Sequence, residues 1–397
     1  MIWVKSHPWL TGLLTVILLL FLFFFYTDLH HLLRESASLP QSMEAAKIPG
    51  AALAVIRNGQ IESAEGYGLA DIAASREVTT DTLFTIASVS KTVTAAALMT
   101  LYEQGKFGLD DDINSYLPIE VRNPDFPDVP ITFRMLLTHT SSIQDSDIYI
   151  HYYTLETEPI LPDSPIALGD YLKDYLTSEG ALYNADDNFL KTAPGTTYVY
   201  TNTGFGLVGY LVEQISGMPF DQYCKTAIFE PLGMEHSGWM FKDVNTEMMA
   251  IPYGYNDLLR QPKPYGFYGY PTYPDGALKT SVNEYARFLS IFINEGQTFE
   301  GKQFLKPETV KEMLALHTYP GMENNSIGLA WHFGNRFYNH TGGDPGINTY
   351  VAFDPVSRTG TILFTNGGGE FDIPGLARQI YFGQQAVKLM TTRMGTP

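Results

Sequence analysis

The most apolar stretch of the chain extends from Trp9 to Tyr26. Its length is close to the minimum that crosses a bilayer as a helix, so it predicts a transmembrane anchor after a short tail over residues 1–8. A cleaved signal peptide would need small residues soon after Phe25. The nearest such triplet begins only at Ser36, which favours a retained anchor over cleavage.

Charges on either side of this stretch set its expected orientation. Lys5 precedes it, whereas Asp28 and Glu35 follow it beside Arg34. Because positive charge is retained on the cytoplasmic side, we expect a single-pass cell-membrane protein with the bulk of the chain outside the cytoplasm. A polar linker over 27–42 then leads to one main domain, expected over 43–397.

Runs of apolar residues predict strands near both ends of this domain. Ala51–Ile56 and Ile61–Gly68 flank Asn58-Gly59, a dipeptide that favours the type I′ turn of a β-hairpin. Strands return late in the chain, in runs rich in β-branched and aromatic residues. These runs are Phe337–His340, Asn348–Phe353 and Thr361–Thr365.

Helical patterns fill the space between. Residues 88–103 are apolar and alanine-rich on nearly every face, which predicts an interior helix that ends near Gly105. Residues 110–240 have the pattern of helices and long loops, and helical spacing resumes after Pro374. The expected fold is α+β: one antiparallel sheet formed by both ends of the domain and flanked by helices, with an inserted, mostly helical subdomain.

Composition removes several classes of function. The chain has 397 residues, 45% of them hydrophobic, which is enough for a large core. Its formal charge of -18 repels polyanions and excludes nucleic acid as a partner. A single cysteine, Cys224, cannot form an internal disulfide, and Cys and His do not cluster at ligand spacing. We therefore expect neither a metal site nor a cofactor.

Ser88 and Lys91 are the strongest candidates for chemistry. Residues three apart share a helix face, so the Lys91 amine can reach the Ser88 hydroxyl. A serine at the start of a helix also lies beside free backbone N–H groups, where the helix dipole favours negative charge. Burial disfavours the charged form of lysine, so we expect an uncharged Lys91 that acts as a general base.

A second motif, Tyr200-Thr201-Asn202, lies just ahead of a predicted helix. A tyrosine hydroxyl beside a lysine can relay a proton, and an asparagine amide can orient a substrate carbonyl. Gly204, Gly206 and Gly209 match the dinucleotide fingerprint, but no strand-helix-strand unit surrounds them. We interpret these glycines as sites of close helix packing.

A third motif is His340-Thr341-Gly342, followed by Gly343. A Gly-rich exit from a strand could direct the backbone N–H of Gly343 toward an oxyanion, with the N–H of Ser88 as the second donor. Two similar triplets begin at His236 and Arg358, the first in the helical region and the second in a turn between strands. Only His340 begins a Gly-rich exit from a strand, so we prefer it.

These three motifs, in this order, resemble the signature motifs of the serine β-lactamase and penicillin-binding protein superfamily. The closer resemblance is to its class C-like, β-lactamase-related branch of esterases, D-amino-acid peptidases and carboxypeptidases. Surrounding phrases agree over about residues 48–366, among them LFTIASVSKTVTA, LLTHTSSI, PGTTYVYTNTGFGLVGYLVE, DGALKTSVNEYARF and HTGGDPGINTYVAFDP.

The resemblance implies a β-lactamase-like fold and a role for each motif. Ser88 would be the acylated nucleophile, with Lys91 and Tyr200 as its proton-transfer partners. The substrate site would be lined by Asn202, His340, Thr341 and Gly342. The expected function is a membrane-anchored serine hydrolase that acts on small-molecule or peptide esters and amides. The alternative is a penicillin-binding or sensor module on the same fold that is acylated without turnover.

Three further features affect this prediction. Many β-lactamases carry lysine where this chain has His340, so a fixed cation for a substrate carboxylate is absent and efficient β-lactam hydrolysis is not expected. We expect His139, in the phrase LLTHTSSI, to be structural. The aromatic run over 265–274 could form a wall of the substrate pocket or a surface loop packed on itself, and the sequence does not decide between them.

Overall fold

The computed structural model describes residues 38–395 except 152, 157–158, 323–324 and 369–372. Within that part of the chain, no helix is both long and apolar enough to cross a bilayer. The predicted anchor at 9–26 lies outside the described residues. Helix α2 begins at Leu39, within the stretch that was predicted as linker, because Leu39 and Met43 face a buried cluster.

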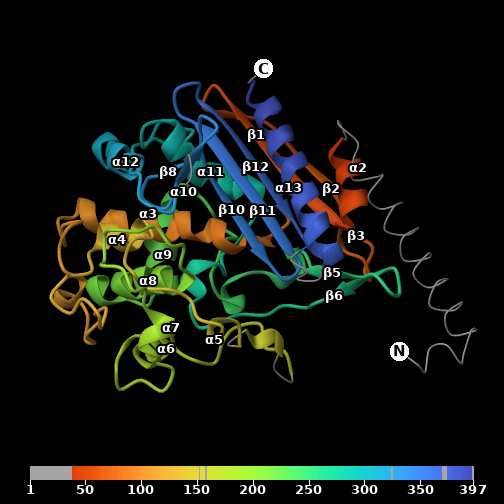
Figure 1. Cartoon of the computed structure of the whole chain (residues 1–397). Helices are drawn as coiled ribbons and strands as arrows, with labels where there is room; N and C mark the ends of the chain where they lie inside the picture. The colour runs from red at the N-terminus through yellow and green to blue at the C-terminus, as the bar shows by residue number, and fades with distance from the viewer. Residues whose placement is uncertain (1–37, 152, 157–158, 323–324, 369–372, 396–397) are drawn as a thin grey trace, which may run out of the picture.

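One antiparallel sheet of eight strands, in the order β3-β2-β1-β12-β11-β10-β9-β8, forms the centre of the domain (Figure 1). Strands from the two ends of the domain pair directly, with Leu53 opposite Leu363. The strand bounds are β1 Gly50–Arg57, β2 Gln60–Asp71, β3 Arg76–Glu77, β8 Ser326–Ile327, β9 His332–Gly334, β10 Phe337–Asp344, β11 Ile347–Asp354 and β12 Thr359–Thr365. The α+β prediction is thus confirmed.

The predicted hairpin between β1 and β2 is present. Arg57 pairs with Gln60 across a turn in which Asn58 has a φ of 53° and Gly59 a φ of 73°. Both positive φ values are those of a type I′ turn, which matches the right-handed twist of the strands.

Helices cover both faces of the sheet (Figure 1). On one face, α2 (Leu39–Ala46) and α13 (Ile373–Arg393) pack on Ala51, Leu53 and Val55 of β1. The alternate residues of β1 point into the main core on the other face. That core includes helices α3 Ser90–Glu103, α4 Phe133–Leu137, α6 Leu168–Leu176, α8 Asn202–Ser216, α9 Phe220–Cys224, α10 Glu230–Leu232, α11 Val282–Ile293 and α12 Pro307–Met313.

Helices α11 and α12 follow beyond residue 240, and the domain also has two small sheets that the sequence pattern did not indicate. These are β4 (Phe84–Thr85) with β7 (Lys279–Thr280), and β5 (Tyr253–Asn256) with β6 (Gln261–Pro264). The short helices α5 (Ile148–His151) and α7 (Ala185–Asn188) lie in the loops below the sheet. Strands of two to four residues carry too little periodicity to be predicted.

Candidate active site

Ser88 lies in a short 3-10 turn, Ala87–Val89, that leads directly into α3. Ala87 is fully buried and has a φ of 46°, a conformation that costs energy for any residue with a Cβ. The Thr349 hydroxyl of β11 donates to the Ile86 carbonyl at 2.7 Å, which holds this turn against the sheet. The nucleophile is thus fixed by a buried turn, while Ser88 itself remains partly exposed.

Lys91 is completely buried one helical turn after Ser88. Its Nζ lies 3.0 Å from the Ser88 hydroxyl, 2.7 Å from the Asn202 side-chain oxygen and 2.9 Å from the Asp275 carbonyl oxygen. The two carbonyl-type oxygens can only accept, so they fix two of the Lys91 N–H groups. The Ser88 hydroxyl can accept from an ammonium or donate to a neutral amine, which permits proton transfer between the two residues.

The charge of Lys91 differs from the sequence-based expectation. Burial lowers its pKa, as predicted, but the interactions of Lys91 with Tyr200, Asp275 and Asp145 together outweigh burial. The pKa of Lys91 therefore lies above its ordinary value, and the prediction of an uncharged resting amine is wrong. The nearest carboxylate oxygen, on Asp275, is 3.8 Å from Nζ.

Tyr200 lies beside this pair, with the Lys91 Nζ 5.0 Å from its ring centroid. Its buried hydroxyl has no hydrogen-bond partner among the described residues. Burial raises the pKa of Tyr200, and the nearby Lys91 and Ser88 oppose that effect. A buried hydroxyl without a partner next to a nucleophile is available for a proton that moves during reaction.

Asp145 positions the Tyr200-Thr201-Asn202 motif. One carboxylate oxygen accepts from the Asn202 backbone N–H at 2.7 Å, and the other accepts from Thr203 N–H at 2.9 Å and from the Thr201 hydroxyl at 3.0 Å. A carboxylate at the first turn of α8 satisfies N–H groups that the helix leaves unpaired. No spacing signal in the sequence singled out Asp145.

The glycines of α8 confirm the packing interpretation. A Cβ on Gly206 would lie 2.9 Å from Thr272, and a Cβ on Gly209 would lie 2.4 Å from Pro274. These two glycines therefore let the segment before Asp275 approach α8 closely, and that segment carries the carbonyl that Lys91 binds.

His340 projects from β10 into the site, where its ring is 6.4 Å from the Tyr200 ring and 5.3 Å from the His332 ring. Its Nδ1 lies 2.8 Å from the Thr341 carbonyl oxygen, so Nδ1 carries the proton. Burial, followed by the nearby His332 and Lys91, lowers the pKa of His340 well below its ordinary value. His340 is therefore neutral, and its Nε2 offers a buried acceptor without a partner in the described structure.

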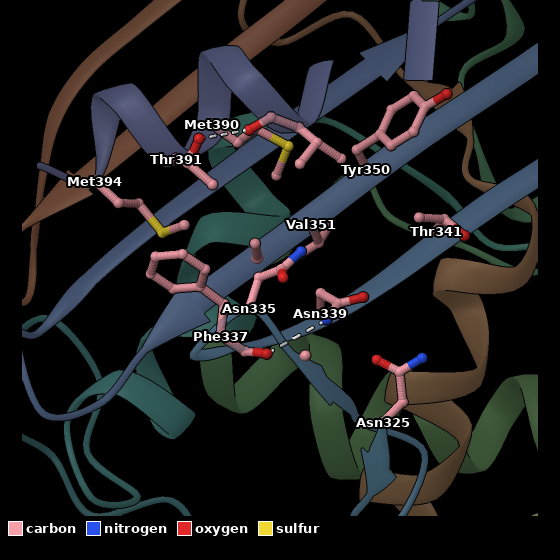
Figure 2. Close-up of a pocket in the computed structure, with 13 residues that line it drawn as sticks. Asn325, Asn335, Phe337, Asn339, Thr341, Tyr350, Val351, Met390, Thr391 and Met394 are labelled. Atoms are coloured by element: carbon pink, nitrogen blue, oxygen red, sulfur yellow. Dashed lines mark hydrogen bonds between the residues drawn. The ribbon is translucent and has the colours of Figure 1, made fainter. Parts of the chain in front are cut away.

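The structure places Thr341 differently from the prediction. Alternate residues of β10 face opposite sides of the sheet, and the exposed Thr341 side chain lines a pocket of about 170 Å³ beneath α13 with Tyr350, Met390 and Met394 (Figure 2). Thr341 thus contributes its backbone carbonyl to His340, whereas its side chain lies on the other face from Lys91 and Tyr200.

Gly342 brings β10 against the nucleophile. A Cβ there would lie 2.5 Å from the Ile86 carbonyl oxygen and 3.0 Å from the Ser88 backbone nitrogen. Gly343, by contrast, would have only the Asn348 side chain within 4 Å, at 3.8 Å. The strand was predicted to end at His340. It continues to Asp344, because β10 stays paired with β11 up to that residue.

Two more histidines surround Tyr200. The His139 ring lies 4.3 Å from the Tyr200 ring, and its Nδ1 accepts from the Thr201 backbone N–H at 3.2 Å. His139 thus supports the motif, as a structural residue would. His332 was not predicted as part of the site; burial, and then Lys91, lower its pKa to about 4.

Part of the aromatic run over residues 265–274 packs against the active site. Tyr268 and Tyr270 are buried in a cluster with Ala87, and Tyr270 donates to Asp344 at 3.2 Å. Burial raises the pKa of Asp344 to about 6. The part of the run at Tyr268 and Tyr270 therefore packs against the nucleophile turn instead of lying on the surface.

The two rival triplets do not join the site. Ser237 binds Thr280 and Glu284, and Arg358 binds Asn294 at the far end of the sheet. Only the motif at His340 meets Ser88 and Tyr200.

This geometry is that of a serine hydrolase with a lysine and a tyrosine at its nucleophile. Residues 37–383 match the family model described as Beta-lactamase, so the chain belongs to that family. It is 26% identical over 361 residues to penicillin-binding protein 4* of Bacillus subtilis, covering 82% of this chain and 73% of that protein.

An esterase also matches. Esterase EstB of Burkholderia gladioli is 32% identical over 222 residues, which cover 55% of this chain and 54% of the esterase. Among solved structures, the octameric penicillin-binding protein homologue from Pyrococcus abyssi superposes with a TM-score of 0.71 at 24% identity, covering 88% of this chain and 76% of that one. This likeness shows the shared fold.

Proposed function

We propose that Ser88 attacks the carbonyl of an ester or amide, forms an acyl-enzyme and releases the acyl group to water. The contact that carries this proposal is the 3.0 Å approach of the buried Lys91 Nζ to the Ser88 hydroxyl. As the Ser88 oxygen attacks, its proton passes to the Lys91–Tyr200 pair, which returns a proton to the leaving group. The backbone N–H groups of Ser88 and Gly343 are proposed to hold the oxyanion.

The raised pKa of Lys91 predicts how the rate of acylation depends on pH. Since the pKa of Lys91 lies above its ordinary value, the form that can accept the Ser88 proton becomes more abundant as the pH rises. Because Lys91 and Tyr200 interact, the apparent pKa values of this rise belong to the pair and not to either residue alone.

Ser88→Ala tests the assignment directly. A fluorophosphonate probe should label the unmodified protein covalently and leave Ser88→Ala unlabelled, because only the hydroxyl can form the adduct. Ser90→Ala is the matched control, since Ser90 is buried and its hydroxyl oxygen accepts from the Leu278 backbone N–H instead of contacting Lys91. Labelling of Ser88→Ala at the unmodified rate is the result that would contradict the proposal.

A second function is favoured by the likeness to a penicillin-binding protein: acylation without turnover. Burst kinetics with a chromogenic ester separate the two. Continued product release after one equivalent supports a hydrolase, whereas one equivalent followed by no further release supports a sensor.

The nature of His340 favours substrates without a free carboxylate at this position. Its neutral imidazole supplies an acceptor instead of a cation. We propose esters and amides whose group beside His340 is an N–H, O–H or uncharged ester, and we expect weak turnover of β-lactams.

We further propose that residues 9–26 anchor the protein in a membrane, with the hydrolase domain outside the cytoplasm. The apolar length of that run and the charges around it support this location. N-terminal sequencing of the mature protein tests it: a start near residue 39 would mean that the run is removed.

A further inference from the structure

A buried carboxylate, that of Asp275, lies beside Lys91. The side chain of Asp275 is only 3% exposed, and its nearest oxygen is 3.8 Å from the Lys91 Nζ. The backbone carbonyl of the same residue accepts from Nζ at 2.9 Å. A side chain with so little exposed surface is out of reach of a substrate, so the charge of Asp275 acts on Lys91 instead.

Tyr149, on the short helix α5, binds this carboxylate. Its hydroxyl donates to the two Asp275 oxygens, at 3.1 and 3.3 Å. The Tyr149 side chain is buried, and its ring meets the Tyr153 ring edge-on with 5.8 Å between the centroids. Burial raises the pKa of Tyr149 well above its ordinary value, so the hydroxyl keeps its proton and remains a donor. Contacts therefore lead from Tyr149 through Asp275 and Lys91 to Ser88.

Other groups also act on the charge of Asp275. Burial raises the pKa of Asp275 to about 7; Lys91 and the Thr272 side chain oppose this effect, whereas Asp344 and Asp145 add to it. Burial also raises the pKa of the other tyrosines near this carboxylate, so they stay neutral: Tyr153, Tyr200 and Tyr270. Asp275 is thus close to the balance between its two protonation states at neutral pH, where a single donor can decide between them.

The direction of the effect follows from the contacts. A hydrogen bond donated to a carboxylate favours its charged form, so Tyr149 favours a charged Asp275. A charged Asp275 in turn favours the charged form of Lys91. We propose that Tyr149 is a positioning residue that holds the Asp275 carboxylate beside Lys91 and thereby keeps Lys91 protonated in the resting enzyme. Its effect on acylation rests on the proposed function, in which Lys91 takes the Ser88 proton.

This arrangement restrains acylation only where Asp275 is ionised. Below about pH 7 most of Asp275 is protonated and does not hold the proton on Lys91. Above that pH the carboxylate is charged, and the restraint is present. Loss of the Tyr149 hydroxyl should therefore speed acylation on the alkaline side and leave it unchanged on the acidic side.

Tyr149→Phe keeps the ring and removes only the donor. The pKa of Asp275 should then rise by about one pH unit, a typical effect of one hydrogen bond to a charged group. At pH 8 about half of Asp275 would be protonated, compared with about a tenth in the unmodified protein. We expect a fluorophosphonate probe to label Ser88 about fivefold faster at pH 8 and at an unchanged rate at pH 6.

Tyr175→Phe is the matched control. The buried Tyr175 hydroxyl accepts from the Ser146 backbone N–H at 2.8 Å and donates to the Gln144 carbonyl at 2.9 Å, so it holds the loop that leads into α5. We expect this variant to keep the unmodified ratio of the rates at pH 8 and pH 6. Slower labelling at both pH values in both variants would mean that Tyr149 only supports the loop, and would overturn the proposal. An unchanged ratio in Tyr149→Phe would also overturn it.

A double variant tests whether Tyr149 acts through Asp275. In Asp275→Asn no carboxylate remains for Tyr149 to stabilise, so the further change Tyr149→Phe should leave the pH profile of labelling as it is in Asp275→Asn alone. A second acceleration of about fivefold at pH 8 in the double variant would show that Tyr149 acts by another route, which contradicts the proposal.

Infrared difference spectra follow the protonated Asp275 carboxyl without any need for catalysis. The carboxyl band that disappears in Asp275→Asn identifies it, and in Tyr149→Phe this band should persist to about one pH unit higher. A shifted band in a protein whose Ser88 is not labelled would contradict the proposed function and leave Tyr149 as a partner of Asp275. Labelling that depends on Ser88, together with an unshifted band, would contradict the role of Tyr149 alone.

Discussion

Lys91 shows how a buried residue can keep its charge. Three acceptors lie within 3.0 Å of its Nζ, and they match the three N–H groups of an ammonium. Burial alone would favour the neutral amine. Because the neighbours of Lys91 supply negative charge, the site holds a cation at rest that must lose its proton before it can accept one from Ser88.

Asp275→Asn is predicted to move the basic limb of the pH profile. The Asp275 carboxylate raises the pKa of Lys91, so its replacement by a neutral amide should lower that pKa and shift the rise of kcat/KM to lower pH. Burial raises the pKa of Asp275 itself to about 7, so the shift applies above that pH, where the carboxylate is charged. A profile that is unchanged, in a variant with normal thermal unfolding, would remove Asp275 from this role.

His340→Lys is predicted to increase reaction with carboxylate-bearing β-lactams. An ammonium in place of the neutral imidazole would supply a charge-assisted hydrogen bond worth about 2 kcal/mol, or about thirtyfold in kcat/KM for acylation by nitrocefin. His236→Lys serves as control, because His236 is exposed and belongs to the triplet outside the site. Equal gains for nitrocefin and an uncharged ester would argue against selection by charge.

At the scale of elements, β10 determines how the third motif meets the nucleophile. The sequence pattern predicted that the strand ends at His340, since glycines disfavour strands. Pairing with β11 overrides that preference, because Gly342 opposite Thr349 is the position where the sheet touches the nucleophile turn. Periodicity cannot reveal a close approach between strands and a turn that are far apart in the sequence.

Two adjacent glycines provide a sharp test of this contact. Gly342→Ala would place a methyl group against the Ile86 carbonyl and the Ser88 backbone nitrogen, and we expect it to lower kcat/KM at least about a hundredfold by displacing the nucleophile. Gly343→Ala would meet only the Asn348 side chain, at 3.8 Å, and keeps its backbone N–H, so its activity should stay within a few-fold of the unmodified enzyme. Similar losses in both variants would show that the close approach is not the cause.

At the scale of the whole molecule, the sheet needs cover on both faces. Phe382 of α13 is fully buried against β1 and β12 in the cluster that includes Leu53 and Leu363. We expect Phe382→Ala to lower the free energy of unfolding by about 3 to 5 kcal/mol, as other large-to-small core changes do. Ile380→Ala, two residues earlier and exposed, should change it by less than about 0.5 kcal/mol. Denaturant titration of both variants measures the difference.

The sequence predicted the class of fold, the β1–β2 hairpin and the long interior helix, because each has a strong local pattern. It also identified Ser88, Lys91, Tyr200, Asn202 and His340, which the structure brings together. It missed Asp145 and His332 because neither lies in a motif and each joins the site only through long-range packing. It predicted the wrong charge for Lys91 because that charge depends on neighbours that only the fold supplies.

The hydrogen bond from Thr349 to the Ile86 carbonyl joins residues that are 263 positions apart in the sequence. A ribosome therefore completes almost the whole domain before the turn that holds Ser88 acquires its support. Contacts of such separation close slowly, because the intervening chain must first lose much of its freedom. The growing polypeptide would thus remain inactive throughout synthesis. Hydrolysis would begin only once the last strands of the sheet had paired with the first.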